Sequence, residues 1–236
     1  MKDLKVKIFA DGADISSIKE LYELPYVKGF TTNPTLMRKA GITNYEEFSR
    51  ELLSLITDLP VSLEVFADDA DSILMQARSI ASWGKNVYVK IPVSTTDGTF
   101  LGPVIKTLSE EKIPLNITAL MTPEQVKSTL ECLSSDVPNI ISVFAGRVAD
   151  TGRDPVSIMI KCRDLIKKSG KNAELLWASP RELYNIIQAA EIGCEIITVD
   201  KGILSKLKLL DKDLLEYSKE TVQMFYKDAV ASKFQI

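Results

Sequence analysis

The chain has 236 residues, of which 45% are hydrophobic and 26% are charged, and its formal net charge is −3. This balance is typical of a globular protein with a substantial core, and with no basic block it argues against a nucleic-acid partner. The chain contains no histidine. Ser-His-Asp triads, Cys-His dyads and histidine-ligated metal sites are therefore excluded, and acid–base chemistry must use carboxylates, lysine, tyrosine or water.

Short apolar runs alternate with longer amphipathic segments along the chain. The runs with strand character are Val6–Ala10, Val27–Phe30, Val61–Phe66, Val87–Val93, Pro114–Ala119, Ile140–Phe144, Glu174–Trp177 and Glu195–Val199. The helical segments are Asp14–Leu24, Asn44–Thr57, Asp69–Ser82, Thr99–Glu111, Pro123–Ser134, Pro155–Ser169, Pro180–Glu191 and Lys201–Leu209. Eight strand–helix units in series predict an α/β fold with a parallel sheet, and eight is the number that closes a TIM barrel.

A doubly wound open sheet is the alternative fold, but it usually needs fewer strands, and no glycine-rich phosphate motif follows the first strand. No linker divides the chain, so we expect one domain, with a (β/α)8 barrel in residues 1–210. Residues 211–236 form a C-terminal helical extension of it. The extra helix, Asp211–Ala231, carries an apolar set that would cover the barrel or pack on a neighbouring subunit.

Lys90 is a charged residue in an otherwise apolar strand, Val87-Tyr88-Val89-Lys90-Ile91-Pro92-Val93. Burying an ammonium is costly unless it is paired, and a lysine with a depressed pKa is a nucleophilic amine that forms Schiff bases with carbonyl compounds. The alternative is that Lys90 lies at the strand end and extends its ammonium to water.

Other polar residues stand where predicted strands end, which is where barrel enzymes place their chemistry. Glu64 interrupts an apolar strand as Lys90 does, Asp11 ends the first strand, and Asn116 and Thr118 share one face of the fifth. These positions predict a polar layer at one end of the barrel. A buried ion pair between Lys90 and Glu64, without a catalytic role, is the alternative.

Arg147, Ser179 and Arg181 follow the sixth and seventh strands and suggest an anion site. Arginine matches phosphate geometry. Asp154-Pro155 and Ser179-Pro180 each place a capping residue before a proline, so Ser179 is expected to cap a helix N-terminus that favours anions. Two solvated arginines are the alternative.

Together these residues resemble the transaldolase family, from Asp11 to Val199. The matching segments are Phe9-Ala10-Asp11, Thr31-Thr32-Asn33-Pro34, Glu64, Val89-Lys90-Ile91-Pro92, Asn116-Ile117-Thr118-Ala119, Ser142-Val143-Phe144-Ala145-Gly146-Arg147-Val148-Ala149-Asp150 and Ala178-Ser179. The chain length is similar to the short subfamily, which also contains the fructose 6-phosphate aldolases. On its residues alone, the Thr-Thr-Asn-Pro run predicts a turn that leads into a helix.

The resemblance implies a class I aldolase type of barrel that works through a Schiff base without metal or cofactor. Lys90 would attack the ketose carbonyl, Asp11 would take the proton of the C4 hydroxyl, and Glu64 and Thr118 would hold a proton-carrying water. The implied substrate-binding residues are Thr32, Asn33, Asn116, Ser142, Phe144, Arg147, Ser179 and Arg181, the last of which would hold the phosphate with Arg147 and Ser179.

Two positions separate the branches of the family. Transaldolases resemble this chain in carrying Glu64 and Phe144, whereas the aldolase branch typically has glutamine and tyrosine there. A tyrosine hydroxyl can help to protonate the enamine and release dihydroxyacetone, and phenylalanine cannot. We therefore predict a transaldolase acting on fructose 6-phosphate or sedoheptulose 7-phosphate as donor and an aldose phosphate as acceptor. A fructose 6-phosphate aldolase and a sugar-phosphate-binding protein without turnover are the alternatives.

The chain departs from the family pattern at Gly12, at Asp200 and at Ala119-Leu120-Met121, which leaves acceptor preference and rate open. Cys132, Cys162 and Cys194 are odd in number and lack metal spacing, so we expect reduced thiols and a cytoplasmic location. No long apolar segment suggests a leader or a membrane span. The resemblance to the short subfamily implies a homo-oligomer, a pentamer or decamer.

Overall fold

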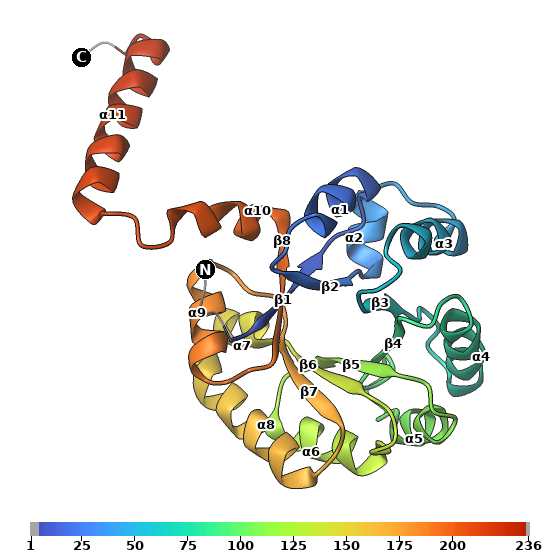
Figure 1. The fold of residues 1–236 in the computed structure, drawn as a ribbon. Helices are drawn as coiled ribbons and strands as arrows, with labels where there is room; N and C mark the ends of the chain where they lie inside the picture. Colours follow the sequence, from blue (N-terminus) through green and yellow to red (C-terminus); the bar gives the residue numbers. More distant parts are fainter. Residues whose placement is uncertain (1–4, 235–236) are drawn as a thin grey trace.

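The computed structural model describes residues 5–234 and contains eight parallel strands that form a closed barrel in chain order (Figure 1). The strands are β1 (Lys7–Asp11), β2 (Val27–Thr31), β3 (Val61–Glu64), β4 (Val87–Pro92), β5 (Leu115–Leu120), β6 (Asn139–Val143), β7 (Ala173–Trp177) and β8 (Ile196–Asp200). Pairing of β1 with β8 over five residues closes the barrel. The predicted (β/α)8 barrel is confirmed, and the open-sheet alternative is wrong.

Helices connect successive strands and surround the barrel (Figure 1). They are α1 (Ile15–Tyr22), α2 (Pro34–Lys39), α3 (Tyr45–Leu55), α4 (Ala70–Ala81), α5 (Gly102–Glu110), α6 (Pro123–Cys132), α7 (Ala145–Asp150), α8 (Pro155–Ser169), α9 (Tyr184–Glu191), α10 (Lys201–Leu204), the 3₁₀ helix η1 (Ser205–Leu209) and α11 (Leu214–Ser232). Hydrophobic periodicity gave no signal for α2 and α7, because six residues give too few turns for a recognisable period. The Thr-Thr-Asn-Pro run predicted only the turn that leads into α2.

The two predicted Ser/Asp-Pro helix starts have different outcomes. Asp154 caps α8 by accepting hydrogen bonds from the amides of Val156 (3.0 Å) and Ser157 (3.3 Å), as predicted. Ser179 caps no helix, because α9 begins only at Tyr184 and its N-cap makes no side-chain bond. The side chain of Asn185 accepts from the amides of the intervening turn instead, which delays the helix.

Two apolar clusters hold the barrel together. The larger one lies between the strands and the surrounding helices. The smaller one contains Phe9, Ile140, Leu176, Ala178 and Ile196, which come from inward-facing positions of four strands and the end of β7. Gly29 makes room for the ring of Phe9, since a β-carbon at this position would lie 2.6 Å from a ring atom. The centre of the barrel is therefore filled, as in other barrels of this class.

The barrel interior is polar on either side of this apolar centre. At the amino ends of the strands, the ammonium of Lys7 on β1 contacts the carboxylate of Glu174 on β7 at 2.5 and 2.6 Å. At the carboxyl ends, Asp11, Glu64 and Lys90 occupy the inward-facing positions of β1, β3 and β4. The expected polar layer is therefore present at the end where barrel enzymes work.

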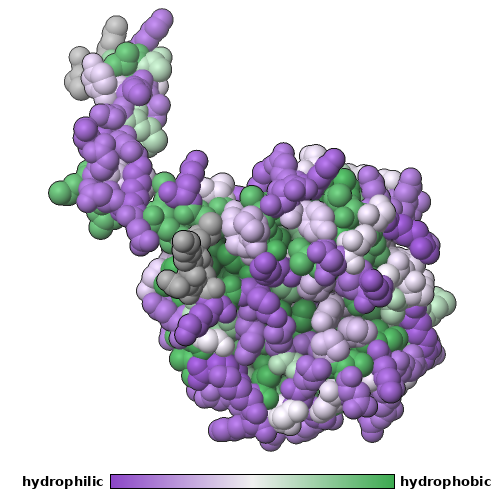
Figure 2. All heavy atoms as spheres, in the orientation of Figure 1, coloured by the Kyte–Doolittle hydropathy of each residue, from purple (hydrophilic) through white to green (hydrophobic). Residues whose placement is uncertain are grey.

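The last helix, α11, extends away from the barrel (Figure 1), and none of its residues is buried. Large apolar side chains on it are exposed, among them Leu215 (83%), Phe225 (63%) and Tyr226 (72%). Of the two expectations for this segment, cover for the chain's own barrel is wrong. Figure 2 shows α11 as a separate arm on which polar and apolar residues are interspersed. No helix within residues 5–234 combines the length and apolarity needed to cross a bilayer.

Candidate active site

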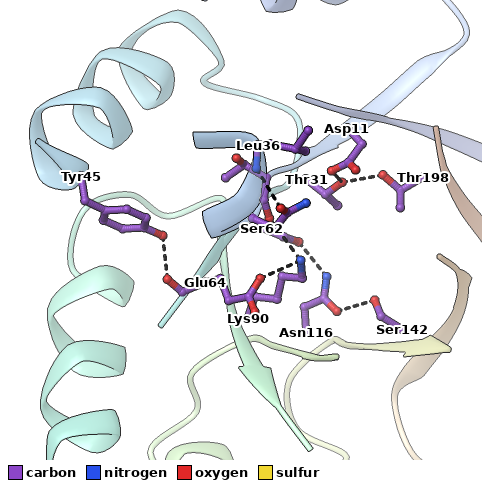
Figure 3. A network of polar contacts seen from close by, with 12 residues as sticks. Asp11, Thr31, Leu36, Tyr45, Ser62, Glu64, Lys90, Asn116, Ser142 and Thr198 are labelled. Atoms are coloured by element: carbon purple, nitrogen blue, oxygen red, sulfur yellow. Dashed lines mark hydrogen bonds and ion pairs between the residues drawn. The ribbon is translucent and has the colours of Figure 1, made fainter. Parts of the chain in front are cut away.

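A cavity of about 620 Å³ opens at the carboxyl ends of the strands. Ten of the twelve predicted site residues line it, and the two exceptions are Thr32 and Asn116. The strand ends that supply them are far apart in sequence and meet only because the barrel closes (Figure 3). The cavity is large enough for a small substrate and contains groups of both charges.

Lys90 and Glu64 form an ion pair at the base of this cavity. They are direct partners in the β3–β4 register, so their side chains lie on the same face of the sheet, and both line the cavity. Lys90 Nζ lies 2.9 Å from Glu64 Oε2 (Figure 3). Lys90 also donates to the carbonyl oxygen of Thr32 at 3.1 Å and is only 7% exposed. Extension of the ammonium to bulk water is therefore wrong. The ion pair that was the alternative for Lys90 and Glu64 is present, and both residues line the cavity.

Asp11 lies across the cavity floor at the end of β1. Thr31 donates a hydrogen bond to its carboxylate at 2.8 Å, and the Thr31 hydroxyl also bonds to that of Thr198 (Figure 3). Desolvation raises the pKa of Asp11, and the positive charge of Lys90 opposes this rise. A carboxyl group with a raised pKa, in a chain without histidine, is suited to accept and return a proton.

Thr118 brings an uncommitted hydroxyl to the same space. Its Oγ1 is buried and has no hydrogen-bond partner within residues 5–234, although the residue lines the cavity. The backbone is distorted directly after it, because Ala119 has φ of +62° and the β5–β6 register shifts there. A buried unpaired hydroxyl and a strained strand end are both features that concentrate at functional sites.

Asn116 and Thr32 are buried and do not line the cavity. Asn116 is fully buried, donates to Ser62 at 2.9 Å and accepts from Ser142 at 2.6 Å (Figure 3). Thr32 contributes its carbonyl oxygen to Lys90, while its hydroxyl is buried without a partner in the described part of the chain. In this structure both residues contact other site residues, and only Ser142 of this group reaches the cavity.

The predicted turn after β2 is present. Asn33 is the N-cap of α2 and accepts from the amide of Leu36 at 3.0 Å, which fixes its side chain at the cavity edge. Tyr45 on α3 donates to the backbone carbonyl of Glu64 at 2.8 Å. Burial, with a smaller contribution from the charge of Glu64, raises the pKa of Tyr45, so its phenol stays protonated.

The three predicted anion-site residues, Arg147, Ser179 and Arg181, lie together on one wall of the cavity. Arg181 binds the carboxylate of Asp150 on α7 through Nε (3.0 Å) and Nη2. Ser179 has φ of +61°, and its carbonyl lies so close to Gly146 that a β-carbon there would be 1.6 Å away. Only glycine permits this approach, so α7 and the β7 loop are tightly joined.

Two residues that depart from the family pattern line a second space beside Asp11. Gly12 and Asp200 border an adjoining cavity of about 270 Å³, and nothing lies within 4 Å of the β-carbon position of Gly12. Asp200 is the register partner of Asp11 and caps α10 by accepting from Ile203 at 2.8 Å. Its negative charge contributes to the raised pKa of Asp11.

Sequence reasoning missed Thr198 and Ser62, which hold Asp11 (through Thr31) and Asn116. Both stand in otherwise apolar strands, so the signal that selected Glu64 and Lys90 would also have found them. Among residues 5–234, no group of three or more Cys, Asp or Glu side chains is arranged to hold a metal ion.

The fold and this cavity define a (β/α)8-barrel protein with a lysine-centred polar site. The chain belongs to the transaldolase/fructose-6-phosphate aldolase family, whose model matches residues 8–236. A probable transaldolase 2 of Listeria monocytogenes is 35% identical over 91% of this chain and 95% of its own length. Probable transaldolases of Dehalococcoides mccartyi (35% identical, 86% and 90% covered) and Thermoplasma volcanium (36%, 86% and 87%) are similar to it as well.

Proposed function

We propose that this protein is a transaldolase, which moves a dihydroxyacetone unit from a ketose phosphate to an aldose phosphate through a Schiff base on Lys90. One observation carries the proposal: the Lys90 amine, 2.9 Å from Glu64, opens into the same cavity as Asp11 and Thr118. The similarity to probable transaldolases supports this reading. Fructose 6-phosphate and sedoheptulose 7-phosphate are the proposed donors.

Capture of the donor requires a neutral amine. Glu64 is placed to accept the ammonium proton of Lys90, after which Nζ attacks the ketose carbonyl carbon and a carbinolamine forms. Loss of water then requires a proton on the departing hydroxyl. A water bound between the Glu64 carboxylate and the free hydroxyl of Thr118 would deliver it, leaving the iminium ion.

Cleavage follows at the opposite side of the cavity floor. The Asp11 carboxylate removes the proton of the C4 hydroxyl, and the C3–C4 bond breaks. Its electrons move into the iminium group, so the aldose phosphate leaves and an enamine remains on Lys90. The raised pKa of Asp11 lets it hold this proton and return it when the enamine attacks the acceptor aldehyde.

The fate of the enamine separates a transferase from an aldolase. Release of free dihydroxyacetone needs a proton on the enamine carbon, and the Phe144 side chain at the cavity wall has no proton to give. The enamine would therefore persist until an acceptor binds. The phosphates of donor and acceptor would bind in turn at Arg147, Ser179 and Arg181.

The test traps the intermediate. The protein is incubated with fructose 6-phosphate and borohydride, digested and analysed by mass spectrometry. We expect the mass of one reduced dihydroxyacetone unit on the peptide that contains Lys90, and no such addition in Lys90→Met. An unmodified Lys90 peptide in the wild-type protein would refute the Schiff base.

A coupled assay then distinguishes the reactions. Glyceraldehyde 3-phosphate formation from fructose 6-phosphate is followed with and without erythrose 4-phosphate. We expect formation that depends on the acceptor. Release of dihydroxyacetone faster than transfer would identify an aldolase, and binding without either product would identify a non-catalytic sugar-phosphate-binding protein.

We further propose that the protein is a homo-oligomer, a pentamer or decamer, in the cytoplasm. The exposed apolar side chains of α11 support an assembly, since a single chain leaves them in water. The free state of Cys132, Cys162 and Cys194 supports a reducing compartment. Native mass spectrometry tests the subunit number, and a monomeric mass at micromolar concentration would contradict the assembly.

A further inference from the structure

The two arginines of the proposed anion site are held in different ways. Arg181 is bound by the Asp150 carboxylate through two nitrogen atoms, so an anion must share its donors with that carboxylate. Arg147 has no carboxylate within 4.0 Å in the part of the chain that the structure describes, and its guanidinium carbon lies 5.4 Å from the centre of the Phe144 ring. A ring face orients a cation without occupying its hydrogen-bond donors.

Phe144 is well fixed for this purpose. It is the N-cap residue of α7, it is partly buried, and its side chain packs against the apolar centre of the barrel. Arg147 follows three residues later, so α7 places the guanidinium on the same side as the ring. Both residues line the 620 Å³ cavity. The ring is therefore held by the apolar centre of the barrel and contacts the Arg147 guanidinium.

We propose that Phe144 is a positioning residue for anion recognition, and that its ring face holds the Arg147 guanidinium at the cavity wall with all donors available to a phosphate group. The proposal rests on the proposed function only for the identification of that phosphate as part of a sugar phosphate. It gives the Phe144 ring a role that is separate from its lack of a hydroxyl group.

Substitutions at position 144 separate the two roles, because Phe144→Tyr keeps the ring and adds the hydroxyl, whereas Phe144→Leu removes the ring. The dissociation constant for inorganic phosphate is measured by calorimetry, without any turnover. We expect Phe144→Leu to weaken phosphate binding about 3- to 10-fold and Phe144→Tyr to change it less than about twofold. Phe144→Met is the second ring-free variant if Phe144→Leu does not fold.

Two double variants identify the partner of the ring. In an Arg147→Met background, Phe144→Leu should have no further effect on phosphate binding, whereas in an Arg181→Met background it should keep its full effect. The same Phe144→Leu variant should raise KM for fructose 6-phosphate by a similar factor if the proposed function is correct.

Several outcomes would overturn the inference: no phosphate binding to the wild-type protein, equal losses in Phe144→Leu and Phe144→Tyr, no loss in either, or a loss that persists without Arg147. The borohydride experiment at Lys90 is independent of all of them. A failed trap with the expected phosphate pattern would refute the proposed function alone, and a successful trap with a flat phosphate pattern would refute only the role of the ring.

Discussion

One lysine–glutamate pair lies near each end of the barrel interior, and the two pairs have opposite surroundings. Lys90 and Glu64, at the carboxyl ends of the strands, have side chains that are 9% and 15% exposed. Lys7 and Glu174, at the amino ends, have side chains that are 43% and 42% exposed. Solvent screens the outer pair, so its contribution to stability is about 0–1 kcal/mol.

Desolvation of the inner pair, Lys90 and Glu64, is costly, and further polar groups lie around this pair. Asp11 has a raised pKa and Thr118 has an unpaired hydroxyl, whereas the apolar centre of the barrel separates the outer pair from them. The same two side-chain types therefore have different surroundings at the two ends of the barrel, and the proposed function uses only the inner pair. A buried charge pair alone is weak evidence of stability or of catalysis.

Replacing each of the two lysines separately by methionine should give the largest difference in transfer activity between the two pairs. Lys90→Met removes the proposed nucleophile, so transfer activity should fall by at least about 10⁴-fold. Lys7→Met should stay within about threefold of wild type, since it lies on the far side of the apolar centre. The coupled assay measures both, and an active Lys90→Met protein would remove the distinction between the two pairs.

The two glutamates give the next contrast. Glu64→Gln removes the group proposed to take the proton from Lys90, so turnover should fall about 100-fold or more. It should also cost up to about 3 kcal/mol in the free energy of unfolding, because Lys90 loses its counter-charge. Urea titration and single-turnover kinetics measure these effects. Equal losses of turnover and stability in Glu174→Gln would show that the difference in exposure between the two ion pairs has no functional consequence.

A smaller effect is expected from Asp200→Asn, which keeps a side-chain oxygen to cap α10 and removes a negative charge beside Asp11. That charge raises the pKa of Asp11, and Asp11 must be ionised to act as a base. The acid limb of the pH profile of kcat/KM should therefore move to lower pH in the variant. Glu174→Gln is the matched control, and its acid limb should stay in place.

The smallest effect is expected for the double change Lys7→Met with Glu174→Gln. We expect the free energy of unfolding to fall by less than about 1 kcal/mol, and the difference from wild type to shrink in 1 M salt. Urea midpoints at low and high salt measure it. A loss of several kcal/mol that salt does not reduce would mean that the outer pair is as protected as the inner one.

The fold and the centre of the site could be predicted because their signals repeat or conflict with their surroundings. The eight strand–helix units repeat the same alternating pattern along the chain, so a mistake in predicting one unit would not change the predicted fold. Lys90 and Glu64 interrupt apolar strands, and the register of neighbouring parallel strands then places them side by side. Both signals come from residues that are close together in the sequence, so they can be recognised without any knowledge of tertiary contacts.

The depth of a side chain in the barrel, and the competition between side chains for the same backbone amides, could not be predicted from the sequence. Alternation places Asn116 on the same face as Thr118, but two residues of strand separate them by roughly 7 Å, so Asn116 lies deeper in the barrel and does not line the cavity. Ser179 precedes a proline as helix caps do, yet the side chain of Asn185 binds the same turn from within the fold. The cation–π contact of Arg147 with Phe144 depends on α7, a helix of six residues that is too short for the sequence pattern to indicate.

The hydrogen bonds around Asp11 connect the two ends of the barrel-forming chain. Thr31 holds the Asp11 carboxylate, and the hydroxyl of Thr198, 167 residues further along, holds Thr31. Contacts at such separation form late in folding, because the intervening chain must first lose its conformational freedom. The hydrogen bonds that hold the proposed base, Asp11, are therefore complete only when β1 pairs with β8. In a refolding experiment, the recovery of turnover would report the time at which the barrel closes.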